Sequence, residues 1–159
     1  MVYATAVRLL GDPADAEDAA QTVFLKAFEH FDDVRESQAA GGWLKTTTRN
    51  VCLNHLARYR SRRRLFSEID TRDEGDAGYE ESIASGDVPI DHAFDLAAAS
   101  EALEQAVRAL PDHQRVPLVL FHFEETSYED IARTLGVSLG KVKTDIHRGR
   151  QALRRLLTP

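Results

Sequence analysis

The sequence predicts an all-α protein made of two small helical modules joined by an acidic, flexible linker. Its apolar residues recur at helical spacing almost throughout, and no segment alternates apolar and polar residues for long enough to form a strand. Its charges fall into blocks although the net charge is −6: residues 41–67 hold seven cations and no acid, residues 68–95 ten acids and one cation, and residues 133–155 seven cations and one acid. Solvated helix faces explain each block singly but explain their alternation less well, so the blocks favour two nucleic-acid-binding modules.

Composition limits the class of protein before any motif is considered. The chain has 159 residues, of which 43% are hydrophobic and 29% charged, enough for one medium domain or two small helical ones. It has no run of 18 apolar residues and no signal-peptide pattern, so we expect a cytoplasmic protein without membrane insertion. The single cysteine, Cys52, lies among apolar neighbours and is expected to be a buried reduced thiol. The six histidines are scattered and no CxxC or HExxH motif occurs, so we expect neither a metal nor a cofactor.

The first module is predicted to contain three helices. Residues 2–10 form a short helix that ends at Gly11, and Asp12-Pro13 then supplies a cap followed by proline at the first helical position. The second helix runs to about residue 31, and a polar loop over residues 32–42 leads to a third helix from Trp43 to about Arg60. Trp43 is expected to pack within the module. The apolar stripe of the second helix is predicted to pack through Ala16, Ala20, Val23, Phe24, Ala27, Phe28 and Phe31.

The linker is predicted over residues 67–92, where low hydrophobicity and high negative charge leave too little apolar surface for a packed core. The next helix starts near Asp91 and stops before Pro111, with Phe94, Leu96, Leu103, Val107 and Leu110 on its apolar side. Another helix begins at Pro111-Asp112. Pro117 either kinks that helix or marks its true start, because proline removes a backbone donor.

Residues 124–155 read as a helix-turn-helix. Ser127 and Asp130 form a capping-box pattern, Gly136 permits the turn, and Ser138 caps the second helix. The apolar stripe of that helix is Val142, Ile146, Leu153 and Leu156 or Leu157. The stripe leaves polar side chains on or near the outer face, where they can enter a major groove: Lys141, Lys143, Thr144, His147 and Arg148. A solvated basic helix that caps a bundle is the alternative.

Three segments together resemble the extracytoplasmic-function (group IV) RNA polymerase sigma factors of the sigma-70 family. Residues 8–31 resemble the polymerase-clamp-binding helix of that family, residues 41–64 its −10-element helix, and residues 109–157 its −35-binding domain. The resemblance implies a dissociable subunit, not an enzyme, that directs core polymerase to specific promoters and promotes DNA opening. It divides the chain into a region 2-like domain over residues 1–66, the linker, and a region 4-like domain over residues 93–159.

The resemblance also implies three sets of site residues. Core polymerase would contact the acidic start of the second helix, where Asp18 and Gln21 match the D-x-x-Q pattern of the family: Asp15, Glu17, Asp18, Gln21, Thr22 and Leu25. The −10 DNA would meet an amide that can read a base edge and a cluster of arginines that hold phosphates: Arg49, Asn50, Arg58, Arg60, Arg62, Arg63 and Arg64. The −35 DNA would meet Ser138, Gly140, Lys141, Lys143, Thr144, His147 and Arg148. The loop over residues 32–42 matches the segment that captures an extruded base.

Three positions depart from the pattern of the family. Thr22 replaces an acidic residue after Gln21, Lys141 replaces a threonine, and Asp145 replaces an arginine. Promoter preference therefore does not transfer from relatives. Asp145 could accept a hydrogen bond from a cytosine amine or pair with Lys141 four residues earlier, and we favour the pairing.

The partners implied by the resemblance are the clamp of the largest polymerase subunit, the flap of the second-largest subunit, promoter DNA and an anti-sigma factor, which would often hold the protein at the membrane. The acidic linker could also cover a basic face before polymerase binds, and neutralising the acids of residues 70–76 would then raise DNA affinity. The main alternative is a stand-alone helix-turn-helix regulator of duplex DNA, which leaves the arginine-rich helix unexplained. An enzyme is disfavoured, because the sequence contains no Ser/His/Asp order, glycine-rich phosphate loop or metal spacing.

Overall fold

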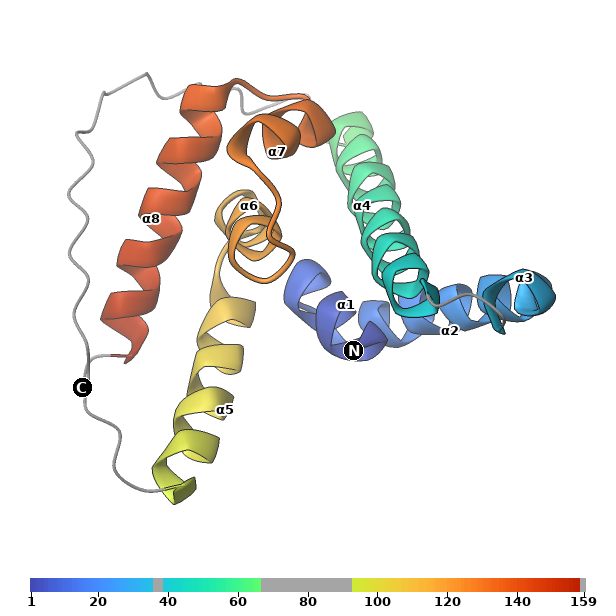
Figure 1. The fold of residues 1–159 in the computed structure, drawn as a ribbon. Coiled ribbons are helices and arrows are strands. Elements are labelled where there is room, and N and C mark those ends of the chain that lie inside the picture. Colours follow the sequence, from blue (N-terminus) through green and yellow to red (C-terminus); the bar gives the residue numbers. More distant parts are fainter. Residues whose placement is uncertain (36–38, 67–92, 158–159) are drawn as a thin grey trace. The chain divides into compact units, whose positions relative to one another are not determined.

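The computed structural model describes residues 1–35, 39–66 and 93–157, and every regular element within these ranges is an α-helix (Figure 1). The all-α prediction is therefore confirmed for the described residues. The chain divides into two compact units, Met1–Arg72 (unit 1) and Asp73–Pro159 (unit 2). The predicted linker comprises residues 67–92, which lie outside the described residues. The expectation that this linker covers a basic face concerns the same residues. No helix in the described ranges is both long and apolar enough to span a membrane.

Helix α1 of unit 1 begins and ends, and helix α2 begins, where the local signals predict. Helix α1 spans Val2–Leu10 and ends at Gly11, whose φ of 76° lies in the left-handed region that glycine tolerates. Helix α2 spans Pro13–Glu29, with proline at its start. The carboxylate of Asp12 accepts hydrogen bonds from the N–H groups of Ala14 at 2.8 Å and Asp15 at 3.0 Å. These bonds satisfy two of the free donors at the start of α2.

The remaining helices of unit 1 differ from the predicted bounds. A short helix α3, Phe31–Arg35, occupies part of the predicted loop, and α2 ends before it. Helix α4 spans Ala40–Phe66, so it begins before Trp43 and continues beyond Arg60. The N–H of Trp43 donates to the carbonyl of Ala39 at 2.9 Å, which brings the two glycines before Trp43 into the first turn. The arginine-rich end extends the helix because arginine is a good helix former.

The core of unit 1 forms where α1, α2 and α4 pack against one another. Its fully buried side chains include Leu9, Val23 and Cys52, so the prediction of a buried thiol is confirmed. The predicted stripe of α2 is only partly correct, because Phe24, Phe28 and Phe31 are 57%, 80% and 55% exposed. The buried face of α2 instead consists of small residues, which let neighbouring helices approach closely, together with one valine: Ala16, Ala19, Ala20 and Val23.

Unit 2 contains α5 (Ala93–Ala109), α6 (Asp112–His122), α7 (Tyr128–Leu135) and α8 (Leu139–Leu157), and α8 packs against the other three. Pro117 lies inside α6, so the option that it marks the start of the helix is wrong. Leu156 and Leu157 are exposed, contrary to the predicted stripe, because they lie in the final turn of α8. The buried core comprises Ala106, Val107, Leu110, Val116, Leu118, Val119, Leu120, Ile131, Val142 and Ile146.

The corner between α5 and α6 is held by a buried arginine. The guanidinium of Arg115 donates to the carbonyl of Leu110 at 2.8 Å and to the carboxylate of Asp112 at 2.7 Å. Only 5% of the Arg115 side chain is exposed. A buried cation requires such partners, because removing an ion from water is costly unless its donors are satisfied.

Candidate polymerase and nucleic-acid interface

One exposed face of α2 carries most of the residues predicted to contact polymerase. Asp18, Gln21, Thr22 and Leu25 are all exposed, and their spacing places them along one side of the helix. The hydroxyl of Thr22 donates to the carbonyl of Asp18 at 3.0 Å. The result is a strip of solvent-facing side chains that combines a carboxylate, an amide and an apolar group.

The other two residues of that predicted set lie differently. Glu17 is exposed on the neighbouring side of α2. Asp15 is half-buried, and its Oδ2 lies 3.3 Å from Nε2 of His55 on α4. Asp15 thus links two helices of unit 1, a role that the sequence did not indicate because His55 lies forty residues away along the chain.

The predicted −10 residues lie along α4. Asn50 and Arg58 are exposed and Arg49 is half-buried. Thr46 and Asn54, one turn before and one turn after Asn50, are exposed as well, so Asn50 lies in the middle of a polar strip. Four further arginines that were predicted to contact phosphates belong to α4, but their side chains lie outside the described part of the structure: Arg60, Arg62, Arg63 and Arg64.

Trp43 is half-buried near the start of α4, and its ring lies edge-on to that of His30 with centroids 6.1 Å apart. This position agrees with the expectation that Trp43 packs within the module.

The helix-turn-helix is built from the predicted caps. The N–H of Asp130 donates to Oγ of Ser127 at 3.1 Å, and the Ser127 hydroxyl donates back to the Asp130 carboxylate at 2.9 Å. Gly136 has φ 66° and ψ 36°, the left-handed conformation that ends α7. The N–H of Lys141 then donates to Oγ of Ser138 at 3.2 Å, which caps α8. These local interactions fix the two helices on either side of a short turn.

The solvent-facing side of α8 carries the predicted −35 residues. Val142 and Ile146 are buried, and this orients the helix. Nε2 of His147 lies 3.0 Å from the amide nitrogen of Gln151. Thr144 is half-buried, and the remaining members of the set are exposed: Ser138, Gly140, Lys141, Lys143, His147 and Arg148.

Asp145 pairs with Lys141, as favoured from the sequence. The Lys141 ammonium lies 3.1 Å from Oδ2 of Asp145. The Asp145 side chain is only 7% exposed, whereas that of Lys141 is 51% exposed. The carboxylate therefore lies beneath the cation, and the lysine is the member of the pair that reaches solvent.

An aromatic and basic cluster joins α6, α7 and α8 and was not predicted. Nε of Arg150 donates to Nε2 of His122 at 3.1 Å, and the Arg150 guanidinium lies 5.6 Å from the ring centroid of Phe121. The Phe121 and Tyr128 rings are 4.5 Å apart. Burial, and secondly the charge of Arg150, lower the pKa of His122 from its ordinary value of 6.5. No periodicity relates His122 to a residue 28 positions later, so the contact has no local sequence signal.

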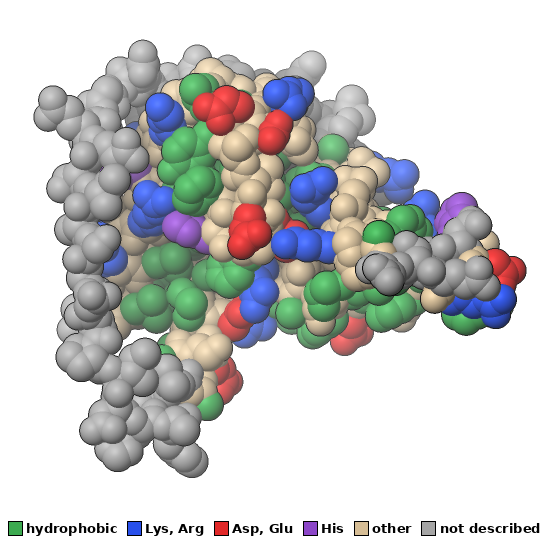
Figure 2. All heavy atoms as spheres, viewed as in Figure 1, with side chains coloured by type: hydrophobic (Ala, Val, Ile, Leu, Met, Phe, Trp, Pro, Cys, Tyr) green, Lys and Arg blue, Asp and Glu red, His purple; other side chains and the backbone are tan. Residues whose placement is uncertain are grey.

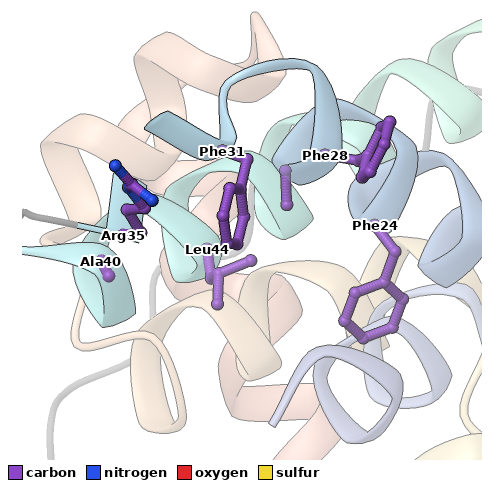
Figure 3. A pocket seen from close by; sticks show the side chains of 7 residues that line it. Phe24, Phe28, Phe31, Arg35, Ala40 and Leu44 are labelled. Carbon is purple, nitrogen blue, oxygen red and sulfur yellow. The ribbon is translucent and has the colours of Figure 1, made fainter. Parts of the chain in front are cut away.

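The exposed phenylalanines of α2 and of the start of α3 line an apolar groove in unit 1. The groove has a volume of about 380 Å³ and is lined by Phe24, Ala27, Phe28, Phe31, Arg35, Ala40 and Leu44. In Figure 3 the Phe31 ring lies beside Leu44, while Phe24 and Phe28 extend from α2. Figure 2 shows hydrophobic side chains on the surface of this unit. The sequence predicted an apolar stripe here but not that its aromatic part would remain exposed.

Within the described ranges, no three His, Cys, Asp or Glu side chains gather in a way that could hold a metal ion. What the two units do present are a helix-turn-helix with a basic outer face and a second helical unit with exposed polar strips. These features are typical of the class of DNA-binding proteins.

Comparison with known proteins narrows this class to a family. Residues 1–63 match the family described as Sigma-70 region 2, and residues 100–153 match Sigma-70, region 4. The chain is 32% identical over 156 residues to "ECF RNA polymerase sigma factor SigW" of Bacillus subtilis, covering 98% of this chain and 82% of that protein. It is 33% identical over 154 residues to "RNA polymerase sigma-H factor" of Pseudomonas aeruginosa, covering 96% and 78% respectively.

A solved structure supports the same fold. The sigma factor RpoE, in a co-crystal structure with the anti-sigma factor NepR from Bartonella quintana, matches with a TM-score of 0.52 and 24% identity, covering 98% of this chain and 89% of that one. The chain belongs to the extracytoplasmic-function (ECF) sigma factors of the sigma-70 family. It directs RNA polymerase to specific promoters in transcription initiation, and a stand-alone regulator is not favoured, because the matches span both units.

Proposed function

We propose that this sigma factor divides promoter recognition between its two units. The domain over residues 1–66 binds the clamp of the largest polymerase subunit and the −10 element, and the domain over residues 93–159 binds the −35 element and the flap of the second-largest subunit. Residues 67–92 connect them. The observation that carries the proposal is that one chain contains both features, an exposed strip of acidic and amide side chains on α2 and a capped, basic helix α8.

The α2 strip suits a protein partner with basic and apolar side chains. Asp18 supplies an exposed charge, and Gln21 can donate and accept hydrogen bonds in the same contact. Leu25, on the same side of the helix, is an exposed apolar group that gains stability when a partner covers it. Thr22 carries no charge, so Asp18 carries the ionic contact on this strip.

The polar strip of α4 suits a DNA strand. The Asn50 amide can pair with the N6 and N7 edge of adenine, while Arg49 and Arg58 hold phosphates. The segment over residues 32–42, only part of which is described, is proposed to receive an extruded base. Exposed Phe31 at its edge offers a surface on which a base can stack.

In unit 2 the start of α8 is proposed to enter the major groove of the −35 element. Lys141 and Lys143 lie in its first turns, and His147 and Arg148 follow one turn later. Each of these cations that contacts a phosphate makes DNA binding more sensitive to salt. The logarithm of the DNA affinity then falls by about one further unit for each unit rise in the logarithm of the salt concentration.

An anti-sigma factor is the proposed regulatory partner, and it could hold the sigma factor at a membrane. The support is that RpoE, which shares the fold, was crystallised with the anti-sigma factor NepR. Such a partner would act by covering surfaces that polymerase requires, including the α2 strip.

The test of the proposed function is direct binding to core RNA polymerase in moderate salt. We expect wild type to bind and Asp18→Arg/Gln21→Ala to lose at least tenfold in affinity, because the exchange reverses the charge and truncates the amide of one strip. The matched control is Asp32→Arg/Asn54→Ala, which makes the same kinds of change at exposed positions of unit 1 outside the α2 strip and should bind core polymerase like wild type.

Two results would count against the proposal. Failure of folded wild-type protein to bind core polymerase would return the stand-alone regulator to first place. Equal binding by Asp18→Arg/Gln21→Ala and wild type would show that the clamp docks elsewhere than on the α2 strip.

A further inference from the structure

Lys141 occupies a position that the local electrostatics of α8 disfavour. It is the third residue of the helix, where unpaired N–H groups give the helix terminus a partial positive charge. The first turn of α8 contains no acidic residue to offset a cation. Its own N–H is already used in the bond to Ser138, so the position serves the cap through the backbone and leaves the side chain available.

Asp145 compensates for this unfavourable placement from one turn further along. Its Oδ2 lies 3.1 Å from the Lys141 ammonium, and its side chain is 7% exposed. A carboxylate buried to this degree is not available to accept from a base in the major groove. Its role must therefore be exerted through Lys141, which reaches solvent.

The pair constrains where the Lys141 ammonium can lie. A lysine side chain has four flexible torsions and loses considerable conformational entropy when it is fixed. In this chain that entropy is lost on folding, when the ion pair forms, so less remains to be lost on binding DNA. An ammonium has three donors and no acceptor, and the guanine edge in the major groove presents two acceptors, O6 and N7.

We propose that Asp145 is a positioning residue that holds Lys141 in the orientation in which it reads a guanine of the −35 element. The inference rests on the proposed function, since it requires α8 to lie in the major groove. It makes Asp145 a determinant of promoter sequence although Asp145 itself does not touch DNA, and it assigns guanine selection to the Lys141 side chain.

The test is selection of promoter DNA by holoenzyme, assembled from the full-length chain and core polymerase. The probe is a duplex library that is randomised in its upstream element, and bound DNA is sequenced. The variants are Asp145→Asn, Lys141→Gln, the double variant, and Arg155→Gln, which removes an exposed cation from the last turn of α8 as a control.

We expect wild type to select guanine at one position. Asp145→Asn should reduce that preference about fivefold to tenfold. Lys141→Gln should move the preference toward adenine, which an amide pairs with. In the Lys141→Gln background, Asp145→Asn should change the base preference less than twofold, because Asp145 acts through Lys141. Arg155→Gln should lower affinity for all sequences alike and leave the preference unchanged.

The outcomes separate the inference from the proposed function. If wild-type holoenzyme selects no upstream sequence, region 4 recognition by α8 is itself overturned. If wild type selects a sequence but Asp145→Asn keeps the same preference within twofold, only the positioning role is overturned. An equal effect of Asp145→Asn with and without Lys141 overturns it as well. If Asp145→Asn loses its fold, its circular dichroism spectrum changes and its base preference changes at every position of the upstream element. Such a result contradicts a specific role of Asp145 at one base.

Discussion

Two arginines of unit 2 make nearly the same ion pair in different surroundings, and they allow the effect of burial to be measured. Arg115 and Arg133 each donate to an aspartate three residues earlier at 2.7 Å. The Arg115 side chain is 5% exposed, whereas that of Arg133 is 77% exposed. Arg115 also donates to the carbonyl of buried Leu110 at 2.8 Å. We predict that Arg115→Met destabilises unit 2 far more than Arg133→Met.

The expected magnitudes follow from burial. Arg115→Met removes at least two charge-assisted hydrogen bonds of about 1.5–3 kcal/mol each and leaves the Leu110 carbonyl without this donor. The variant no longer bears the cost of burying the guanidinium, which offsets part of the lost hydrogen bonding. Asp112 is exposed enough for water to hydrate its carboxylate. The net loss in unfolding free energy is therefore about 3 kcal/mol. Arg133→Met removes a solvent-exposed pair, which contributes about 0.2–1 kcal/mol. Arg115→Lys keeps the charge but not the fork of donors, so its loss should lie between these values.

The assay is native-state hydrogen exchange of the full-length chain, read on peptides from α6, residues 112–122. At about 1.4 kcal/mol per tenfold change, Arg115→Met should raise the exchange rate of protected α6 amides by more than about 100-fold. Arg133→Met should raise it by no more than about fivefold. The reasoning is refuted if the two variants differ by less than about 0.5 kcal/mol, because identical pair geometry would then outweigh burial.

Three further predictions concern other parts of unit 2. The His122 pKa is lowered on folding, so the unfolded chain binds more protons than the folded chain below pH 6.5. The His122 contribution to stability should therefore be complete above that pH and decline as the pH falls. Urea titrations at several pH values should show a weaker decline for His122→Gln than for wild type. A Cβ at Gly149 would lie 2.8 Å from Cδ1 of buried Leu118, so Gly149→Leu should overpack the site by about 1–3 kcal/mol, visible as a lower melting temperature. Ser127→Ala should cost about 1 kcal/mol by removing the cap of α7, again in urea unfolding, and an unchanged midpoint would show that the cap is dispensable.

Helix boundaries in this chain were predictable wherever a local interaction sets them. Asp12, Ser127 and Ser138 each satisfy N–H groups two or three residues later, and the glycines at positions 11 and 136 adopt a positive φ. Each of these features depends on residues within one turn of each other, so the sequence contains all the information needed. Boundaries without such a signal, at α3 and at both ends of α4, were predicted less well.

Packing across the unit was less predictable, because it depends on which helix faces meet. On α2, periodicity correctly identified an apolar side but could not distinguish its buried part from its exposed part. Alanines at positions 16, 19 and 20 allow close helix contact, so the core needs little volume there, and the larger Phe24 and Phe28 remain at the surface. The same limit applies to the contact between His122 and Arg150, which exists only after α6 and α8 have packed.

The ion pair at the start of α8 lies between these two cases. The spacing of Lys141 and Asp145 allowed pairing, but it equally allowed Asp145 to face DNA, since both are consistent with a helix. What decides is that Val142 and Ile146 are buried, which sets the rotation of α8 and places Asp145 beneath the surface. A single acid in a basic helix therefore changes from a candidate base-reading group to a support for one. Its effect on promoter choice should depend on the identity of residue 141, and the selection experiment with the double variant measures that dependence.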